Sequence, residues 1–200
     1  MIAVLNYGIG NIKSIIRALK RLEIEACVTS DPQVIHNADR LILPGVGSFD
    51  AAIQKLESVE CMKKILEIEV FTARKPILGI CVGMQIMCNS SQEGQRKGLS
   101  WIDTPVLRIP KKLGNRVPHV GWMKIQTQND NPLTYNLDQK DFYFSHSYYI
   151  DASHEISVAS VKIEPNIASV INYGNVWGVQ FHPEKSRENG LSLLKNFSEL

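Results

Sequence analysis

Three residue types that together make an activated covalent nucleophile stand in two short motifs of this sequence. Cys81 lies in the glycine-flanked stretch 79–85, and His182 and Glu184 lie in the stretch 180–184. A thiol attacks carbonyl carbon as its thiolate, an imidazole moves the proton, and a carboxylate orients the imidazole. We therefore predict that the three side chains meet in one site, because a fold can join motifs that are far apart in sequence.

The elements around Cys81 predict a turn from a strand into a helix. The apolar run 76–80 indicates a buried parallel strand, and residues 84–88 favour a helix. Gly79 and Gly83 let the backbone turn sharply, and a helix N-terminus favours a thiolate. The alternative is an inert buried cysteine. We keep that interpretation for Cys27, Cys61 and Cys88, since none has glycine on both sides.

The second motif follows a predicted strand at 176–181. Pro183 prevents a continuing strand ladder and favours extended backbone, where residues two apart project to one side. His182 would then act as general base and acid, with Glu184 fixing its tautomer. The alternative is an exposed turn with a surface glutamate.

A third segment, 41–48, is an apolar strand with a glycine-rich turn leading into a helix near Ser48. Such a turn can present backbone N–H groups to an oxyanion. A phosphate-binding loop is disfavoured, because no Gly-Lys-Ser/Thr follows and the GxGxxG spacing is absent.

These three segments together resemble the class I glutamine amidotransferases, whose glutaminase domains use a Cys-His-Glu triad. Within the family, the motifs are most similar to those of the glutaminase subunits of imidazole glycerol phosphate synthases. Four further stretches support the resemblance across nearly the whole chain: 6–11, 117–122, 143–149 and 184–186.

The resemblance implies roles for individual residues. Cys81, His182 and Glu184 would be the triad, and backbone groups of Val46, Gly47 and Val82 would hold the oxyanion. The glutamine substrate would contact a further set, for which His146 is alternatively a core histidine: Gly45, Gln85, Ser145, His146 and Ser147.

The resemblance also implies a partner. It would be a (β/α)8-barrel cyclase subunit that receives ammonia through a channel in a heterodimer serving histidine biosynthesis. The candidate interface elements are 8–11, 118–122 and Lys185, although Trp122 is alternatively an ordinary core aromatic.

Four positions depart from the usual family pattern, at Asn6, Val82, Thr104 and Met123. They keep open a paralogous glutaminase that feeds a sugar amidotransferase in surface-polysaccharide biosynthesis. A regulatory or scaffolding subunit without turnover is the third possibility, disfavoured by the intact triad.

Composition favours one cytoplasmic enzyme domain spanning residues 1–200. The chain is 44% hydrophobic and 21% charged, without a linker or repeat, and its net charge of +2 gives no reason to expect nucleic acid. We expect no membrane association, since residues 1–5 are too short for a signal sequence and no apolar run suits a bilayer. We also expect reduced thiols, no metal site and no cofactor, because the four cysteines form no CxxC and the histidines are scattered.

The order of predicted elements indicates an α/β fold. Strands at 2–5, 25–29, 40–43 and 76–80 alternate with helices beginning near Ile12, Pro32 and Ser48 and spanning 59–72. Strands at 106–109, 123–126, 142–149, 156–163, 168–172 and 176–181 would add antiparallel structure before a closing helix at 186–199. We predict a mostly parallel, flavodoxin-like central sheet with helices on both faces, and a site at the carboxyl ends of its strands.

Overall fold

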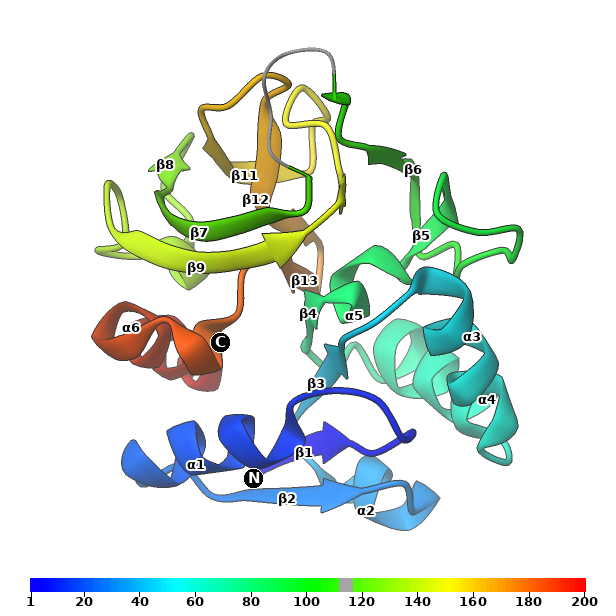
Figure 1. Ribbon diagram of the computed structural model, residues 1–200. Helices are drawn as coiled ribbons and strands as arrows, with labels where there is room; N and C mark the ends of the chain where they lie inside the picture. Colours follow the sequence, from blue (N-terminus) through cyan, green and yellow to red (C-terminus); the bar gives the residue numbers. More distant parts are fainter. Residues whose placement is uncertain (112–116) are drawn as a thin grey trace.

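The computed structural model describes residues 1–111 and 117–200, and its centre is an eight-stranded sheet ordered β2-β1-β3-β4-β13-β12-β11-β8 (Figure 1). Five neighbouring strands run parallel: β2 (Ala26–Thr29), β1 (Ile2–Leu5), β3 (Arg40–Gly45), β4 (Ile77–Cys81) and β13 (Val176–Val179). The other three pair antiparallel: β12 (Ile167–Tyr173), β11 (Ser157–Val161) and β8 (Gln126–Thr127). The predicted α/β class with a mostly parallel sheet and added antiparallel strands is confirmed.

The helices fall into two groups. Helix α1 (Ile12–Arg21) contacts α6 (Arg187–Glu199), and α4 (Met62–Glu67) contacts α2 (Pro32–Asn37) and α3 (Phe49–Ser58). The α1/α6 pair and the α3/α4 pair lie on opposite sides of β3 and β4 (Figure 1). No helix in the described part of the chain is both long enough and apolar enough to cross a bilayer.

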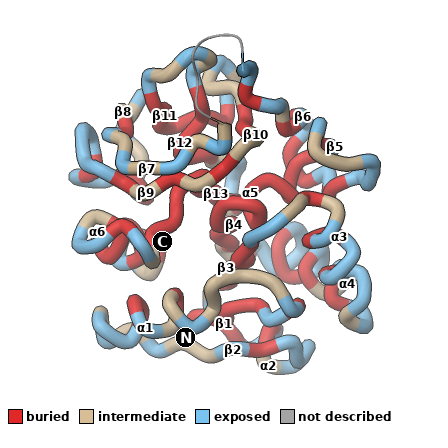
Figure 2. The backbone as a smooth tube through the Cα atoms, in the orientation of Figure 1, coloured by how far each residue is buried: buried red, intermediate tan, exposed pale blue. Residues whose placement is uncertain are grey.

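Burial explains why these segments form these elements. Strands β1, β4 and β13 are buried at every residue, as apolar runs between two helical layers require, and the centre of the molecule is correspondingly buried (Figure 2). Helix α1 buries Ile15, Ala18 and Leu19, which its three- and four-residue spacing places on one face. Helix α2 begins where predicted, because the Asp31 side chain accepts hydrogen bonds from the backbone N–H of Gln33 and Val34.

Two small sheets lie beside the main one. The first joins β5 (Cys88–Ser91), β6 (Ile102–Arg108) and β10 (Tyr148–Tyr149), and the second pairs β7 (His119–Lys124) with β9 (Asp141–His146). Strand β9 and β10 are separated only by Ser147, so the predicted strand at 142–149 changes sheets at that residue.

Two predicted helices are wrong in extent. The helix predicted at 84–88 is α5 (Val82–Gln85), and Cys88 instead opens β5. Its continuation is prevented because the carbonyls of Ile86 and Met87 accept hydrogen bonds from Leu99 and Trp101. The helix predicted at 59–72 consists of α4 followed by a π-helical turn, η1 (Ile68–Thr72). Likewise, the strand predicted at 123–126 is divided between β7 and β8.

Candidate active site

Cys81 stands at the junction of β4 and α5, at the carboxyl end of the sheet. Its register partner on β3 is Gly45, and its backbone has φ 54° and ψ −112°. A positive φ is strained for a residue with a Cβ, and such outliers concentrate at functional sites. The side chain is buried, and α5 is a single turn of four residues.

The flanking glycines serve close packing and not the turn that the sequence suggested. Neither Gly79 nor Gly83 has a positive φ; Cys81 itself carries it. A Cβ on Gly83 would lie 2.0 Å from the carbonyl oxygen of Leu43, and one on Gly79 would lie 2.7 Å from the Met84 backbone. The glycines therefore let α5 pack directly against β3 and β4, and this packing fixes the position of the Cys81 backbone.

His182 follows β13 and contacts the other two triad candidates. Its Nδ1 donates to Glu184 Oε1 at 3.0 Å, and its ring also forms a hydrogen bond with the Cys81 side chain. The extended backbone predicted after His182 is wrong, because 183–185 forms a 3-10 turn, η4 (Pro183–Lys185). The turn still brings the carboxylate under the ring, so the structure joins Cys81, His182 and Glu184.

Hydrogen bonds and charge decide the protonation of His182. Burial lowers the pKa of this imidazole, but the hydrogen bonds and charges of Cys81 and Glu184 outweigh burial and raise the pKa to about 9. The imidazolium is therefore the stable form at neutral pH, and it carries a proton available to a leaving group.

A cavity of about 310 Å³ opens at this junction. Nine of the predicted triad, oxyanion and substrate residues line it: Val46, Gly47, Cys81, Val82, Gln85, Ser145, His146, Ser147 and His182. Glu184 lies outside the lining with a nearly inaccessible side chain, and Asn11 Nδ2 donates to its Oε1 at 3.4 Å. Gly45 is also absent from the lining, since a Cβ there would lie 2.1 Å from the Gly83 nitrogen.

Two lining residues use most of their polar atoms within the protein. Gln85 Nε2 donates to the Tyr148 carbonyl at 3.0 Å and to Gln180 Oε1 at 2.9 Å, which leaves its own Oε1 for the cavity. His146 Nδ1 donates to the same carbonyl at 2.8 Å, and its Nε2 lies 3.2 Å from His119 Nδ1. Burial lowers the pKa of His146 to about 3, so this ring is neutral.

Sequence reasoning missed Glu93 and Tyr148 as lining residues and placed Pro118 and Lys185 only at an interface. Glu93 Oε2 accepts a hydrogen bond from the Phe49 N–H at the start of α3, at 2.7 Å. The sequence around Glu93 does not indicate a place in the cavity, because the contact between the β5–β6 connection and α3 forms only on folding. The serine at 48, in contrast, caps α3 near the predicted start.

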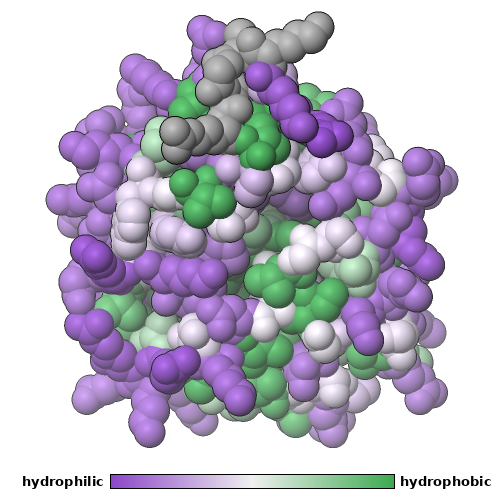
Figure 3. Space-filling model, in the orientation of Figure 1, coloured by the Kyte–Doolittle hydropathy of each residue, from purple (hydrophilic) through white to green (hydrophobic). Residues whose placement is uncertain are grey.

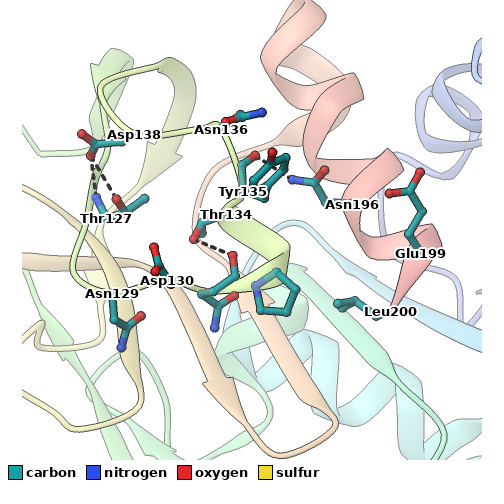
Figure 4. Close-up of a pocket in the computed structure, with 12 residues that line it drawn as sticks. Thr127, Asn129, Asp130, Thr134, Tyr135, Asn136, Asp138, Asn196, Glu199 and Leu200 are labelled. Atoms are coloured by element: carbon teal, nitrogen blue, oxygen red, sulfur yellow. Dashed lines mark hydrogen bonds between the residues drawn. The ribbon is translucent and has the colours of Figure 1, made fainter.

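A larger cavity, of about 740 Å³, lies away from these residues, between the segment 127–138 and the end of α6 (Figure 4). Asp138 there accepts hydrogen bonds from the backbone N–H and the hydroxyl of Thr127. The Thr134 hydroxyl donates to the Asn131 carbonyl. The lining of this cavity contains neither cysteine nor histidine, so its size does not make it the reactive site. Across residues 1–111 and 117–200, no three His, Cys, Asp or Glu side chains gather as a metal site would need.

Comparisons with known proteins agree with this geometry. The family model for glutamine amidotransferase class-I matches residues 3–199. Imidazole glycerol phosphate synthase subunit HisH of Methanothermobacter thermautotrophicus is 42% identical over 100% of this chain and 98% of its own length. The HisH subunit of Streptococcus gordonii is also 42% identical, over 100% of this chain and 96% of its own. A crystal structure of a glutamine amidotransferase superposes with a TM-score of 0.77 at 19% identity, covering 99% of this chain and 97% of its own.

Proposed function

Because the chain belongs to the class I glutamine amidotransferase family, we propose that it hydrolyses the side-chain amide of L-glutamine and delivers the ammonia to a cyclase that makes imidazole glycerol phosphate in histidine biosynthesis. The observation that carries the proposal is that His182 contacts both Cys81, beside it in the cavity lining, and Glu184, behind the lining. The HisH names of the full-length relatives support the pathway.

In the first half of the reaction, the Cys81 sulfur attacks the amide carbon of glutamine. The C–N bond then breaks, and His182 gives its proton to the departing nitrogen, so that ammonia leaves and a glutamyl thioester remains. A pKa of about 9 keeps His182 protonated for this step at neutral pH. Glu184 holds the ring by accepting from Nδ1, which directs Nε2 toward the sulfur.

In the second half, His182 takes a proton from water, and the resulting hydroxide attacks the thioester. The C–S bond breaks, glutamate leaves and the thiolate returns. Both tetrahedral intermediates carry an oxyanion, for which we assign backbone N–H groups at Val46, Gly47 and Val82. Gly47 has φ 88° and open space where a Cβ would stand, which suits a peptide that must face the cavity.

The cavity has complementary groups for an amino acid. Glu93 offers a carboxylate and Gln85 offers its Oε1, and both accept hydrogen bonds as an α-ammonium group requires. Ser145 and Ser147 offer donors on the same wall. We assign His146 to holding this wall, since both of its ring nitrogens are engaged within the protein, and Gly45 to the packing beneath it.

The proposed partner surface adjoins the cavity, because Pro118 and Lys185 from its candidate elements line the cavity. Val120 and Trp122 on β7 are exposed at 54% and 41%, so Trp122 is not an ordinary core aromatic. Arg187 lies 4.9 Å from the Trp122 ring and Lys185 lies 5.6 Å from the Tyr143 ring. On this face, hydrophobic residues interrupt a mostly hydrophilic surface (Figure 3). An exposed apolar strand beside cations suits a barrel cyclase with acidic groups, docked as a heterodimer over an ammonia channel.

Asn11 links the turn at 8–11 to the triad, because its amide donates to Glu184. A partner that contacts this turn would act directly on the carboxylate that orients His182. We expect the enzyme to work in the cytoplasm on glutamine, with no cofactor, nucleic acid or membrane taking part.

The test is ammonia release from glutamine by the purified chain, alone and with a cyclase subunit plus its nucleotide substrate. We expect low activity alone, strong stimulation by the pair, and at least a 10³-fold loss in Cys81→Ala. Cys88→Ala, at a cysteine outside the cavity lining, is the matched control and should retain activity.

Other outcomes redirect the assignment. Stimulation by a sugar amidotransferase but not by the cyclase would move the chain to polysaccharide biosynthesis. Equal activity of Cys81→Ala and the parent would refute the triad, and silence with every partner would favour a scaffolding subunit.

A further inference from the structure

Gln180 is a fully buried residue outside the cavity lining, two positions before His182. Its Nε2 donates to the Cys81 sulfur at 3.7 Å, and its Oε1 accepts from Gln85 Nε2 at 2.9 Å. The thiol therefore has two side-chain partners, His182 and Gln180. The proposed reaction uses only His182, so the role of the second partner needs its own explanation.

The pairing of β4 with β13 explains how both side chains reach the sulfur. Ile80 and Val179 are register partners in this parallel pair, so Cys81, which ends β4, lies near Gln180, the residue that follows β13. Side chains two positions apart on extended backbone share a side. Gln180 and His182 accordingly both lean toward β4, while Phe181 between them stacks on Phe142 with ring centroids 4.1 Å apart.

A backbone carbonyl fixes the direction of this hydrogen-bond chain. The Tyr148 carbonyl can only accept, and it receives both Gln85 Nε2 and His146 Nδ1. Gln85 must therefore present its NH₂ group on this side. Gln180 Oε1 must therefore accept from that NH₂ group. The NH₂ group of Gln180 is then left to face the Cys81 sulfur. A flipped Gln180 amide would set two NH₂ groups against each other and an oxygen against a thiolate.

We propose that Gln180 is a positioning residue that donates a hydrogen bond to the Cys81 thiolate, with its orientation imposed by the Tyr148 carbonyl through Gln85. The inference rests on the proposed role of Cys81 as nucleophile. A donor beside a buried sulfur favours the anion over the thiol, since a hydrogen bond to a charged group is stronger than one to a neutral group. It also fixes the position of Cys81, which lines the cavity.

The test is the pH profile of Cys81 alkylation by iodoacetamide, read by peptide mass spectrometry so that the other cysteines do not interfere. Gln180→Met keeps the volume and removes the donor. We expect the midpoint of its profile to rise by about one pH unit, which is about tenfold less thiolate on the acid side. Gln180→Glu keeps the shape and places a negative charge at the sulfur, and its midpoint should rise further.

Ser169→Ala is the matched control, because Ser169 is equally buried on the adjacent strand β12 and its hydroxyl has no hydrogen-bond partner in the described part of the chain. Its alkylation profile should superimpose on the parent profile. If the folded Gln180→Met and Gln180→Glu proteins also superimpose on the parent, the inference is overturned. A structural role alone would lower stability without moving the midpoint.

Alkylation needs neither glutamine nor a partner, so its outcome is separable from that of the turnover assay. A shifted midpoint with no glutaminase activity under any condition would support the role of Gln180 and refute the proposed function. Where turnover is present, its loss in Gln180→Met should be recovered by raising the pH by about one unit.

Discussion

His182 and His146 line the same cavity and are almost equally buried, yet they are opposite in protonation. Burial lowers the pKa of both imidazoles. For His182, hydrogen bonds and charges from Cys81 and Glu184 reverse the effect and bring the pKa to about 9, whereas His146 meets a carbonyl and a second histidine and its pKa falls to about 3. Partners, not depth, decide the charge of a buried histidine here.

The difference divides the cavity into two walls. The reactive wall consists of Cys81 and His182, the residues proposed to exchange protons, and Glu184 supports it from outside the lining. The neutral wall, His146, Tyr148 and Gln85, holds donors and acceptors whose directions are fixed by a carbonyl. A change in the reactive wall should therefore affect turnover, and a change in the neutral wall should affect substrate affinity.

The largest expected effect comes from removing the Glu184 charge, which helps to make the pKa of His182 differ from that of His146. Glu184→Gln keeps the shape but can present its NH₂ group to His182 Nδ1, which favours the wrong tautomer. We expect turnover to fall about 10³- to 10⁴-fold with little change in KM. Steady-state kinetics with the partner present is the measurement. Glu188→Gln, at an exposed carboxylate paired with Arg21, is the control and should behave like the parent; a similar loss there would break the comparison.

The two histidines should also affect stability in opposite pH windows. The folded pKa of His146 is depressed, so its contribution is present above about 6.5 and is lost as pH falls toward 3. The folded pKa of His182 is raised, so its contribution is present below about 6.5 and is lost as pH rises through about 9.

Urea unfolding from pH 4 to 10 measures both windows. We expect His146→Asn to flatten the acid side, where the parent loses a few kcal/mol, and His182→Asn to flatten the alkaline side. Parallel curves for the parent and both variants would contradict the assigned protonation states.

The smallest effect should come from His146→Asn on catalysis. The asparagine side chain still donates to the Tyr148 carbonyl but no longer accepts from His119. We expect KM for glutamine to rise about tenfold, the cost of about one hydrogen bond, with kcat within a few-fold of the parent. A loss in kcat as large as that of Glu184→Gln would show that the walls are not separate.

Much of this arrangement was predictable from sequence, because the parallel strands are apolar runs and the motifs stand at their carboxyl ends. Glu93, Tyr148 and Gln180 were not predicted as parts of the site. Tyr148 acts through its backbone carbonyl, which carries no residue signature. Gln180 depends on the register of β13 against β4, and Glu93 on a contact with α3, both of which form only on folding.

The glycines show a different limit. The sequence indicated that Gly79 and Gly83 matter to the backbone around Cys81, but it did not indicate the structural reason. The sequence suggested a sharp turn of the backbone, whereas the structure has α5 packed so closely on β3 that a Cβ on Gly83 would overlap the Leu43 carbonyl. Tertiary packing, which no local pattern encodes, determined both this and the short length of α5.

Strands β4 and β13 lie side by side, yet residues 82–175 separate them along the chain. Synthesis proceeds from the N-terminus, so the ribosome releases Cys81, the proposed nucleophile, well before His182, its proposed base. Contacts between such distant segments also form slowly. Until β13 emerges and pairs, Cys81 has neither His182 nor Gln180 beside it. The growing chain therefore contains this thiol without its partners, and only the synthesis of residues 176–200 supplies both.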